Sequence, residues 1–345
     1  MTSEAIDSMT SEAIEAAQND VETPSRSAAQ PTRPRINFES YALPMAWLVV
    51  AALFSVLRPS TFATYANIRT IFGSQSILVI VALGLTIALV AGDFDLSVGA
   101  NLGFAAMLTA WLNADVGWPV WIAVILALAA GLAIGAVNSL LVVGVGVDAL
   151  VATLGVATLV TGVTFATTNY MIVSGVDRSL VNVVSSRPFG LPLSFYYAML
   201  LATGIWWFLR YTAAGRRLAF AGGNREAARL SGLSVNRLRS GAFLFSGFCA
   251  ALAGVALTGT LGAADPNTGL AFLLPAFAAA FLGSTTIRPG HFNPWGTVVA
   301  VYFLVTGITG LQLLGLRQWI QEIFYGGSLI LAIVLAKIVS QRPTV

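Results

Sequence analysis

The stretch RYTAAGRRLAFAGGNREAARLSGLSVNRLR, from Arg210 to Arg239, decides the fold because it is a basic island in an otherwise apolar sequence. Glu226 is its one acid, set against Arg210, Arg216, Arg217, Arg225, Arg229, Arg237 and Arg239. Burying these guanidinium groups in hydrocarbon would cost roughly 3 kcal/mol each, so about 20 kcal/mol together. The segment therefore cannot cross a bilayer, and its excess of arginine predicts a cytoplasmic location.

A short helix is predicted inside this segment, over REAARLS. Asn224 can cap its first turn, and Gly232 suits the position just after its last turn. Glu226 would face Arg229 at i+3. Ala227, Leu230 and Leu233 recur every three residues and would face one way. The residues alone leave two interpretations open: a docking helix that inserts into a partner, or a connector whose arginines only set the membrane orientation.

The composition identifies an all-α polytopic membrane protein. Hydrophobic residues make up 57% of the chain, charged residues 10%, and the mean hydropathy is +0.82. The arginines flank apolar segments, so membrane topology explains the pI of about 9.2 better than nucleic-acid binding does. Cys249 and His291 are each the only residue of their type, which excludes an internal disulfide and a His/Cys metal cluster. No phosphate-binding GxxxxGK[ST] motif occurs, so the chain is predicted to be no ATPase and no enzyme.

The order of segments predicts about ten membrane helices. Residues 1–36 are polar and acidic and are interpreted as a disordered cytoplasmic tail. A membrane domain at 37–338 follows, with a cytoplasmic loop at 212–239, and residues 339–345 form a short cytoplasmic tail. Both chain ends are thus expected on the cytoplasmic side. The apolar segments lie at about 41–57, 68–91, 95–113, 117–144, 150–171, 195–211, 240–262, 270–287, 295–314 and 318–338.

A polar break interrupts the apolar sequence between Leu83 and Met107. It carries Asp93 and Asp95, followed by Ser97 and Asn101. An acid at membrane depth is a functional-site hypothesis, and a glycine-punctuated break suggests a discontinuous helix whose ends face a cavity. The alternative is a tight cytoplasmic turn in which Asp95 caps the next helix through Ser97.

A second break resembles the first in layout. Gly283 ends an apolar segment, the hydroxyls of Ser284, Thr285 and Thr286 follow, and a glycine-proline turn precedes the next segment. The two breaks would be corresponding parts of two pseudo-repeated halves with broken helices, which points to a binding or gating region between them. Asn138 and Thr153 are further polar positions, although an asparagine within a helix often makes only a helix–helix hydrogen bond.

Small residues recur at helical spacing in several apolar segments. The pairs are Gly131 and Gly135, Gly155 and Gly162, and Gly247 and Gly254. Such spacing favours close helix packing in lipid.

Four motifs in order resemble the membrane subunits of sugar-importing ABC transporters of the ribose/xylose/arabinose type. GDFDLSVGANL resembles the family's GGIDLSVG, and GAVNSLLV followed by VATLG resembles GxxNGLLV and IxTLG. AGGNREAARLSGLSVNRLR is similar to its GGNxxAARLSGI loop, and FLGSTT with PWGT resembles GGTS with GT. The resemblance covers roughly residues 60 to 338.

The resemblance implies a permease in the bacterial inner membrane that works with an ABC ATPase subunit, which binds ATP-Mg, and a periplasmic sugar-binding protein. It also implies a second permease copy or a paralogous permease, with membrane lipid around them. In this family the loop helix is where the permease meets the ATPase, and the matching positions are Gly223, Asn224, Glu226, Ala227, Ala228, Arg229, Leu230 and Gly232. The residues expected to line or shape the path of a sugar are Asp93, Phe94, Asp95, Ser97, Asn101, Asn138, Thr153, Ser284, Thr285 and Thr286.

The sequence departs from the family pattern at three places. Asp93 replaces the family's second glycine, Val147 to Leu150 replace a proline-rich approach, and LLPAFAA at Leu273 to Ala279 lacks two acids. A secondary transporter that uses Asp93 and Asp95 as a proton or sodium site is the alternative, and it would give an ion-dependent flux from this chain alone. A membrane-embedded enzyme is disfavoured because no acid–base set is clustered.

Overall fold

The computed structural model describes the backbone of residues 38–340 and the side chains of residues 40–334. The predicted tail at 1–36 and most of that at 339–345 lie outside this range, although the last helix extends to Ser340. Residues 38–340 are mostly helical. Two short strands are also present: β1 (Val173–Ser174) pairs antiparallel with β2 (Ala263–Ala264).

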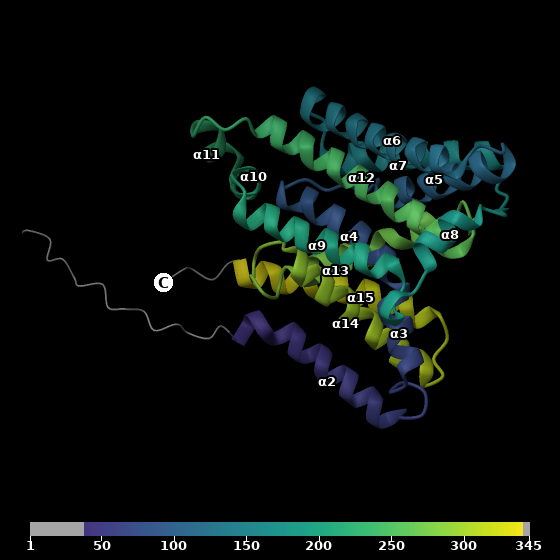
Figure 1. The fold of residues 1–345 in the computed structure, drawn as a ribbon. Helices are drawn as coiled ribbons and strands as arrows, with labels where there is room; N and C mark the ends of the chain where they lie inside the picture. Colours follow the sequence, from purple (N-terminus) through teal and green to yellow (C-terminus); the bar gives the residue numbers. More distant parts are fainter. Residues whose placement is uncertain (1–37, 341–345) are drawn as a thin grey trace, which may run out of the picture. The chain divides into compact units, whose positions relative to one another are not determined.

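Each predicted apolar segment overlaps with at least one helix, although α12 begins five residues before its segment and α3 begins three residues before its own (Figure 1). These helices are α2 (Ala42–Leu57), α3 and α4 (Tyr65–Ser74 and Ser76–Val90), α5 (Val98–Ala110), α6 (Val120–Ser139), α7 (Ala149–Thr168), α9 (Leu193–Tyr211), α12 (Val235–Leu261), α13 (Leu273–Gly283), α14 (Pro294–Leu313) and α15 (Trp319–Ser340). Between them lie the short helices α8 (Arg178–Ser185), α10 (Ala213–Gly223) and α11 (Arg225–Leu230).

Among the described residues, six helical stretches are long and apolar enough to cross a membrane. They are Ser40–Leu57, Tyr65–Val90, Val120–Val145, Ala149–Thr168, Val235–Leu261 and Pro294–Leu313. Thr268–Gly283 and Trp319–Val334 are apolar but shorter. The count of ten spans therefore stays a prediction.

Helices α5 and α13 each have one end at a polar break. α5 begins after the first break and continues directly into a π-helical turn at Trp111–Asp115. α13 follows a 3-10 helical turn at Thr268–Phe272 and ends at the second break. Both polar breaks of the sequence are thus real interruptions of helix, at 91–97 and 284–293.

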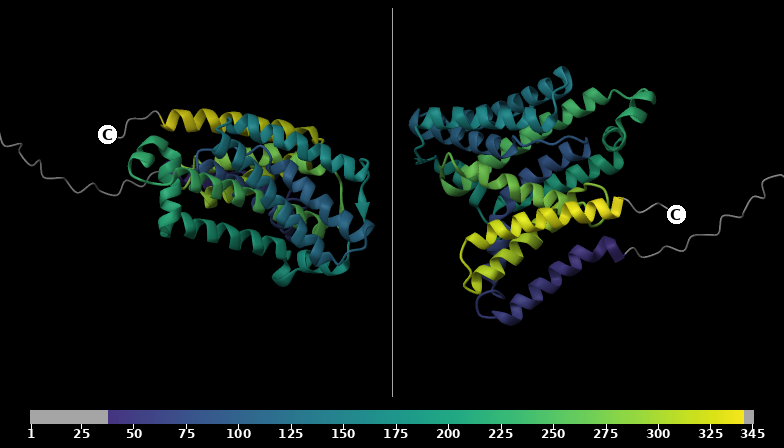
Figure 2. Two further views of the ribbon diagram at one scale, coloured as in Figure 1. Left: turned by 90° about the horizontal axis from the view of Figure 1, so that it is seen from above. Right: turned by 180° about the vertical axis from the view of Figure 1, so that it is seen from behind.

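Helix α4 forms the centre of the packing. Every residue from Ser76 to Leu89 is buried, which fits a helix that is apolar on all sides. It packs against α9, α12, α13 and α14. In Figure 1 and in the right-hand view of Figure 2, α2 lies at one edge of the helices and α6 and α7 lie at the opposite edge.

Glycine allows α6 and α12 to approach closely. A Cβ on Gly131 would lie 2.8 Å from the carbonyl oxygen of Gly247, and one on Gly135 would lie 2.5 Å from that of Phe243. The prediction of close packing is confirmed here. For Gly155 and Gly162 on α7 it stays a prediction, because a Cβ on either would meet no atom of another helix within 4 Å among the described residues.

Candidate functional site

The break after α4 begins where the chain meets α10. Gly92 has φ +79°, a conformation that glycine adopts without strain. Gly222 on α10 packs so tightly against the carbonyl of Val90 that an added Cβ would overlap it. The end of α4 and the arginine-rich segment are therefore in backbone contact, although they are far apart in sequence.

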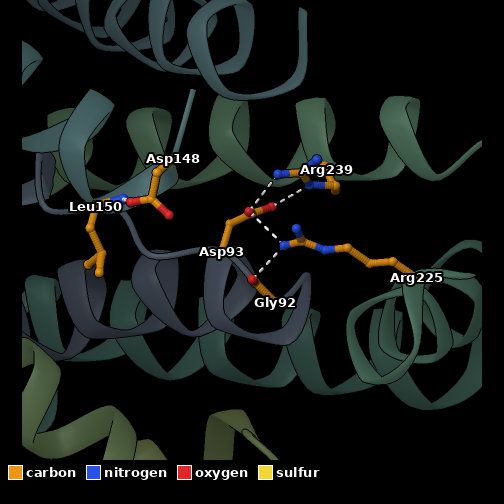
Figure 3. A network of polar contacts seen from close by, with 6 residues as sticks. All are labelled: Gly92, Asp93, Asp148, Leu150, Arg225 and Arg239. Atoms are coloured by element: carbon orange, nitrogen blue, oxygen red, sulfur yellow. Dashed lines mark hydrogen bonds and ion pairs between the residues drawn. The ribbon is translucent and has the colours of Figure 1, made fainter. Parts of the chain in front are cut away.

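Asp93 binds two arginines of that segment (Figure 3). Arg239 on α12 donates from Nε to Oδ2 and from Nη2 to Oδ1, both at 2.7 Å. Arg225, the first residue of α11, donates from Nη2 to Oδ1 at 2.8 Å and to the Gly92 carbonyl. Asp93 is only 2% exposed and Arg239 is buried as well. Together, Asp93, Arg225 and Arg239 form an ionic clamp that joins the helix break to α11 and α12.

Asp95 holds the same break against α6 and, at a second point, against α12. Its Oδ1 accepts from the Ser97 hydroxyl at 2.6 Å and from the Ser97 backbone N–H at 3.0 Å. Its Oδ2 accepts from the Ser246 hydroxyl on α12 at 2.7 Å. Asn138 on α6 donates to the Ser97 hydroxyl at 2.7 Å. Asp95 thus stabilises the turn before α5 and cross-links α6 and α12, but it does not cap α5 as the capping alternative expected, because α5 begins after Ser97 without a side-chain cap.

Helix α7 also contacts the first break. The Leu96 backbone N–H donates to the Thr153 hydroxyl at 3.0 Å. Asn101 on α5 donates from Nδ2 to the carbonyls of Gly131 and Gly247. Within residues 38–340, Oδ1 of Asn101 and of Asn138 are buried and accept no hydrogen bond.

The break residues differ in exposure. Buried positions are held by Asp93, Asp95, Ser97, Asn101, Asn138 and Thr153, and each of them binds side chains or backbone of this chain. Phe94 is partly exposed and stacks on Phe277 and Phe281 of α13. Phe94 therefore links the first break to the helix that leads into the second.

At the second break the predicted hydroxyls bind backbone. Ser284 and Thr285 donate to the carbonyls of Phe281 and Leu282, each at 2.7 Å. Thr286 donates to the Ser40 carbonyl at 2.8 Å, beside the start of α2. In this arrangement the three hydroxyls stabilise the end of α13.

The role of Asn293 at this break was not predicted from the sequence. Its Oδ1 accepts from the Gly296 N–H at 2.7 Å and caps α14, and its Nδ2 donates to the carbonyl of Gly283. The Asn-Pro pair ahead of an apolar run is a helix-start signal that could have revealed it.

Helix α11 has the boundaries that its capping residues predict. Asn224 accepts from the Ala227 N–H at 2.9 Å, and Gly232 follows the helix with φ +76°. Ala228 is fully buried with Ala221 and Val235, whereas the Leu230 side chain is 85% exposed. The helix is therefore fixed on its inner face and presents an apolar side chain outward.

Two expectations for this helix were wrong. Glu226 and Arg229 form no ion pair in the described structure, whose salt bridges all involve Asp93. Leu233 packs into the cluster around Ala228, so it does not share an outward face with Leu230. The reason is that the chain turns at Gly232 and directs Leu233 back toward α12.

The sequence matches a known protein family and several known proteins. The family model described as "Branched-chain amino acid transport system / permease component" matches residues 67–333. The D-allose transport system permease protein of Escherichia coli (strain K12) is 32% identical, over 85% of this chain and 90% of the relative. The ribose import permease protein of the same strain is 33% identical, over 84% and 91%.

The autoinducer 2 import system permease protein of Enterobacter sp. (strain 638) is 32% identical, over 84% of each chain. No solved structure matches.

Proposed function

Since the chain belongs to the permease family of branched-chain amino acid transport systems, we propose that it is the transmembrane permease subunit of an ABC importer for a sugar or related polyol. Its relatives are named for import of D-allose, ribose and autoinducer 2. The observation that carries the proposal is the ionic clamp, because it connects an outward-facing short helix directly to a break in the membrane helices.

The partners follow from this role. An ABC ATPase subunit binds ATP-Mg and supplies the energy, and a periplasmic binding protein delivers the substrate. A second permease, either a copy of this chain or a paralogue, completes the pathway. The exposed apolar residues Leu154 and Leu159 on α7 and Ile125 on α6 support contacts with lipid or a neighbouring subunit on that side.

We place about ten crossings in the bacterial inner membrane, with both chain ends in the cytoplasm and two related halves. The interrupted helices α5 and α13 support this arrangement because α5 follows a break whose Asp93 and Asp95 are buried in protein, and α13 precedes a break whose Ser284 and Thr286 are buried. Irregular backbone at membrane depth is tolerated only in such surroundings. The arginine segment on the same side as the chain ends agrees with the positive-inside rule.

The ATPase docks on α11, and Leu230 enters a pocket of that partner. Glu226 and Arg229 flank the contact, and Ala228 anchors the helix to α10 and α12. When the ATPase subunits close, α11 moves as a rigid unit because its cap and its buried alanine hold it. Arg225 and Arg239 pass this movement to Asp93, and so to the break between α4 and α5.

The break then shapes the path for the substrate. Asp95, Ser97, Asn101, Asn138 and Thr153 hold the ends of four helices together, so a shift of Asp93 changes how these helices meet. Phe94 contributes from the first break, where it packs on α13. The hydroxyls of Ser284, Thr285 and Thr286 contribute from the second break, at the end of α13. The orphaned amide oxygens of Asn101 and Asn138 supply hydrogen-bond acceptors for a hydroxylated substrate once the helices separate.

The ion-coupled alternative loses its main support. The Asp93 carboxylate is already neutralised by two guanidinium groups, so a sodium ion or proton would have to displace Arg239 from a buried pair. No comparison favours a secondary transporter.

Co-purification from membranes in mild detergent, followed by mass spectrometry, tests the docking role. Wild-type protein is expected to recover an ATPase subunit, and Leu230→Asp and the double variant Glu226→Ala/Arg229→Ala are expected to lose it. Arg216→Ala is the matched control, because Arg216 lies in the same segment but binds the Tyr211 carbonyl of its own chain.

Two outcomes would contradict the proposal. If Leu230→Asp retains the ATPase at the wild-type level, α11 is not the docking helix. If wild-type protein recovers no ATPase even after cross-linking in intact membranes, the ABC assignment itself is wrong.

A further inference from the structure

An apolar groove of about 830 Å³ lies where α9 and α12 both pack on α4. Ile80 and Ile87 of α4 form its floor, Leu200 and Ile205 line it from α9, and Phe245 and Leu252 line it from α12. It is separate from the clamp and the two breaks. Leu200 is 73% exposed, so the groove opens at the molecular surface.

Two glycines keep the groove open. Gly204 on α9 and Gly241 on α12 both line it, and a Cβ added to either would meet no atom within 4 Å. The space beside them is thus unfilled by this chain. An apolar space of this size on membrane helices is filled by something apolar, because dry unfilled volume forfeits dispersion contacts.

One end of the groove is charged. Arg237, near the start of α12, is the charged residue in the lining, and it has no acidic partner in the described part of the chain. From Arg237 to Ala256 the groove follows α12 for about 29 Å, close to the thickness of a hydrocarbon core. The half next to Arg237 therefore corresponds to one leaflet.

We propose that this half of the groove binds an anionic phospholipid. Its phosphate pairs with Arg237, and an acyl chain lies along Gly241, Phe245 and Gly204. A single cation at the mouth of an otherwise apolar groove complements an amphiphile with one anionic head, as basic pockets between membrane helices do. A helix from another protein would cover Arg237 without neutralising it, which is why a lipid is the better occupant.

The first test uses the full-length permease with its ATPase, in bilayers of phosphatidylglycerol and phosphatidylcholine. A photoactivatable phosphatidylglycerol should label peptides from α9 and α12 that contain Gly204, Phe208 or Arg237, and unlabelled phosphatidylglycerol should compete. The same label on phosphatidylcholine should give about fivefold less product, the ratio expected from one arginine near an anionic headgroup. Labelling that is spread evenly over α2, α7 and α15 would overturn the proposal.

Variants separate the acyl chain from the headgroup. Gly241→Leu, or Gly204→Leu as a second choice, fills the groove and should abolish labelling, whereas Gly155→Leu fills open space on α7 and should not. Arg237→Gln should remove the preference for phosphatidylglycerol, with Arg217→Gln as control. Unchanged labelling in the filled variants, equal labelling by both lipids in wild-type protein, or a change of oligomeric state in place of lost lipid would each refute the site.

Discussion

The guanidinium of Arg239 binds the carboxylate of Asp93 through two hydrogen bonds of 2.7 Å, although the two residues are 146 positions apart in the chain. A bidentate pair of this kind fixes orientation as well as distance. Because Arg225 binds the same carboxylate, one acidic side chain determines how α11, α12 and the end of α4 meet. Its contribution can be measured.

Replacing Asp93 with Asn should destabilise the protein strongly. The change leaves the buried Arg239 without its counter-charge, and breaking a buried pair in this way costs roughly 3–5 kcal/mol. Thermal unfolding in detergent should show a clear drop in Tm, and transport in proteoliposomes should be lost. Asp115→Asn, at an exposed position, is the control; equal Tm values for the two variants would show that the clamp is energetically unimportant.

Gly222→Ala and Gly223→Ala form a matched pair. At Gly222 a methyl group would overlap the Val90 carbonyl, whereas at Gly223 it would meet nothing within 4 Å. We expect Gly222→Ala to separate α10 from α4 and to lower both expression and transport, while Gly223→Ala stays near wild type. The yield of monodisperse protein and the ATP hydrolysis of the assembled complex measure the difference. Similar behaviour of the two variants would argue against this contact.

Ser246→Ala should weaken the hold of α12 on the break. It leaves Oδ2 of Asp95 buried without a donor, which costs about 1–3 kcal/mol and more if the group is charged. Thr203→Ala, which removes a hydroxyl that binds only its own helix on α9, should change stability by far less. Chemical or thermal denaturation of both variants provides the comparison, and an equal loss in each would mean that Ser246 has no special role.

Asn224→Ala should loosen α11 without unfolding the membrane helices. Loss of the capping hydrogen bond to the Ala227 N–H costs about 1 kcal/mol, while Asn224→Asp keeps an acceptor. Hydrogen exchange at residues 225–230 should be several-fold faster in the alanine variant only. If exchange is unchanged, the fixed position of Ala228 alone holds this helix.

Local signals in the sequence were sufficient to predict the apolar segments, the two helix breaks and α11, but they did not indicate α8 or α10. The polar residues from Gly92 to Ser97 and from Ser284 to Thr286 marked both helix breaks, because such residues cannot continue an apolar span. Asn224 and Gly232 marked the ends of α11, because a cap acts within a few residues of itself. The inward position of Ala228 and the outward position of Leu230 could not be predicted, since they depend on how α10 and α12 are placed.

By itself, the sequence determined that this is a helical membrane protein with a basic segment outside the bilayer, two broken helices and a permease's motifs. Composition and short-range patterns carry that information, because partition into lipid and helix capping are properties of a residue and its near neighbours. Only the tertiary structure decided that the Asp93 carboxylate forms salt bridges with Arg225 and Arg239, which takes it out of use as an ion site. That pairing arises where α4, α10 and α12 converge, and it requires the close approach that Gly222 permits. A contact between residues so far apart in the chain is set by helix packing, which no local pattern encodes.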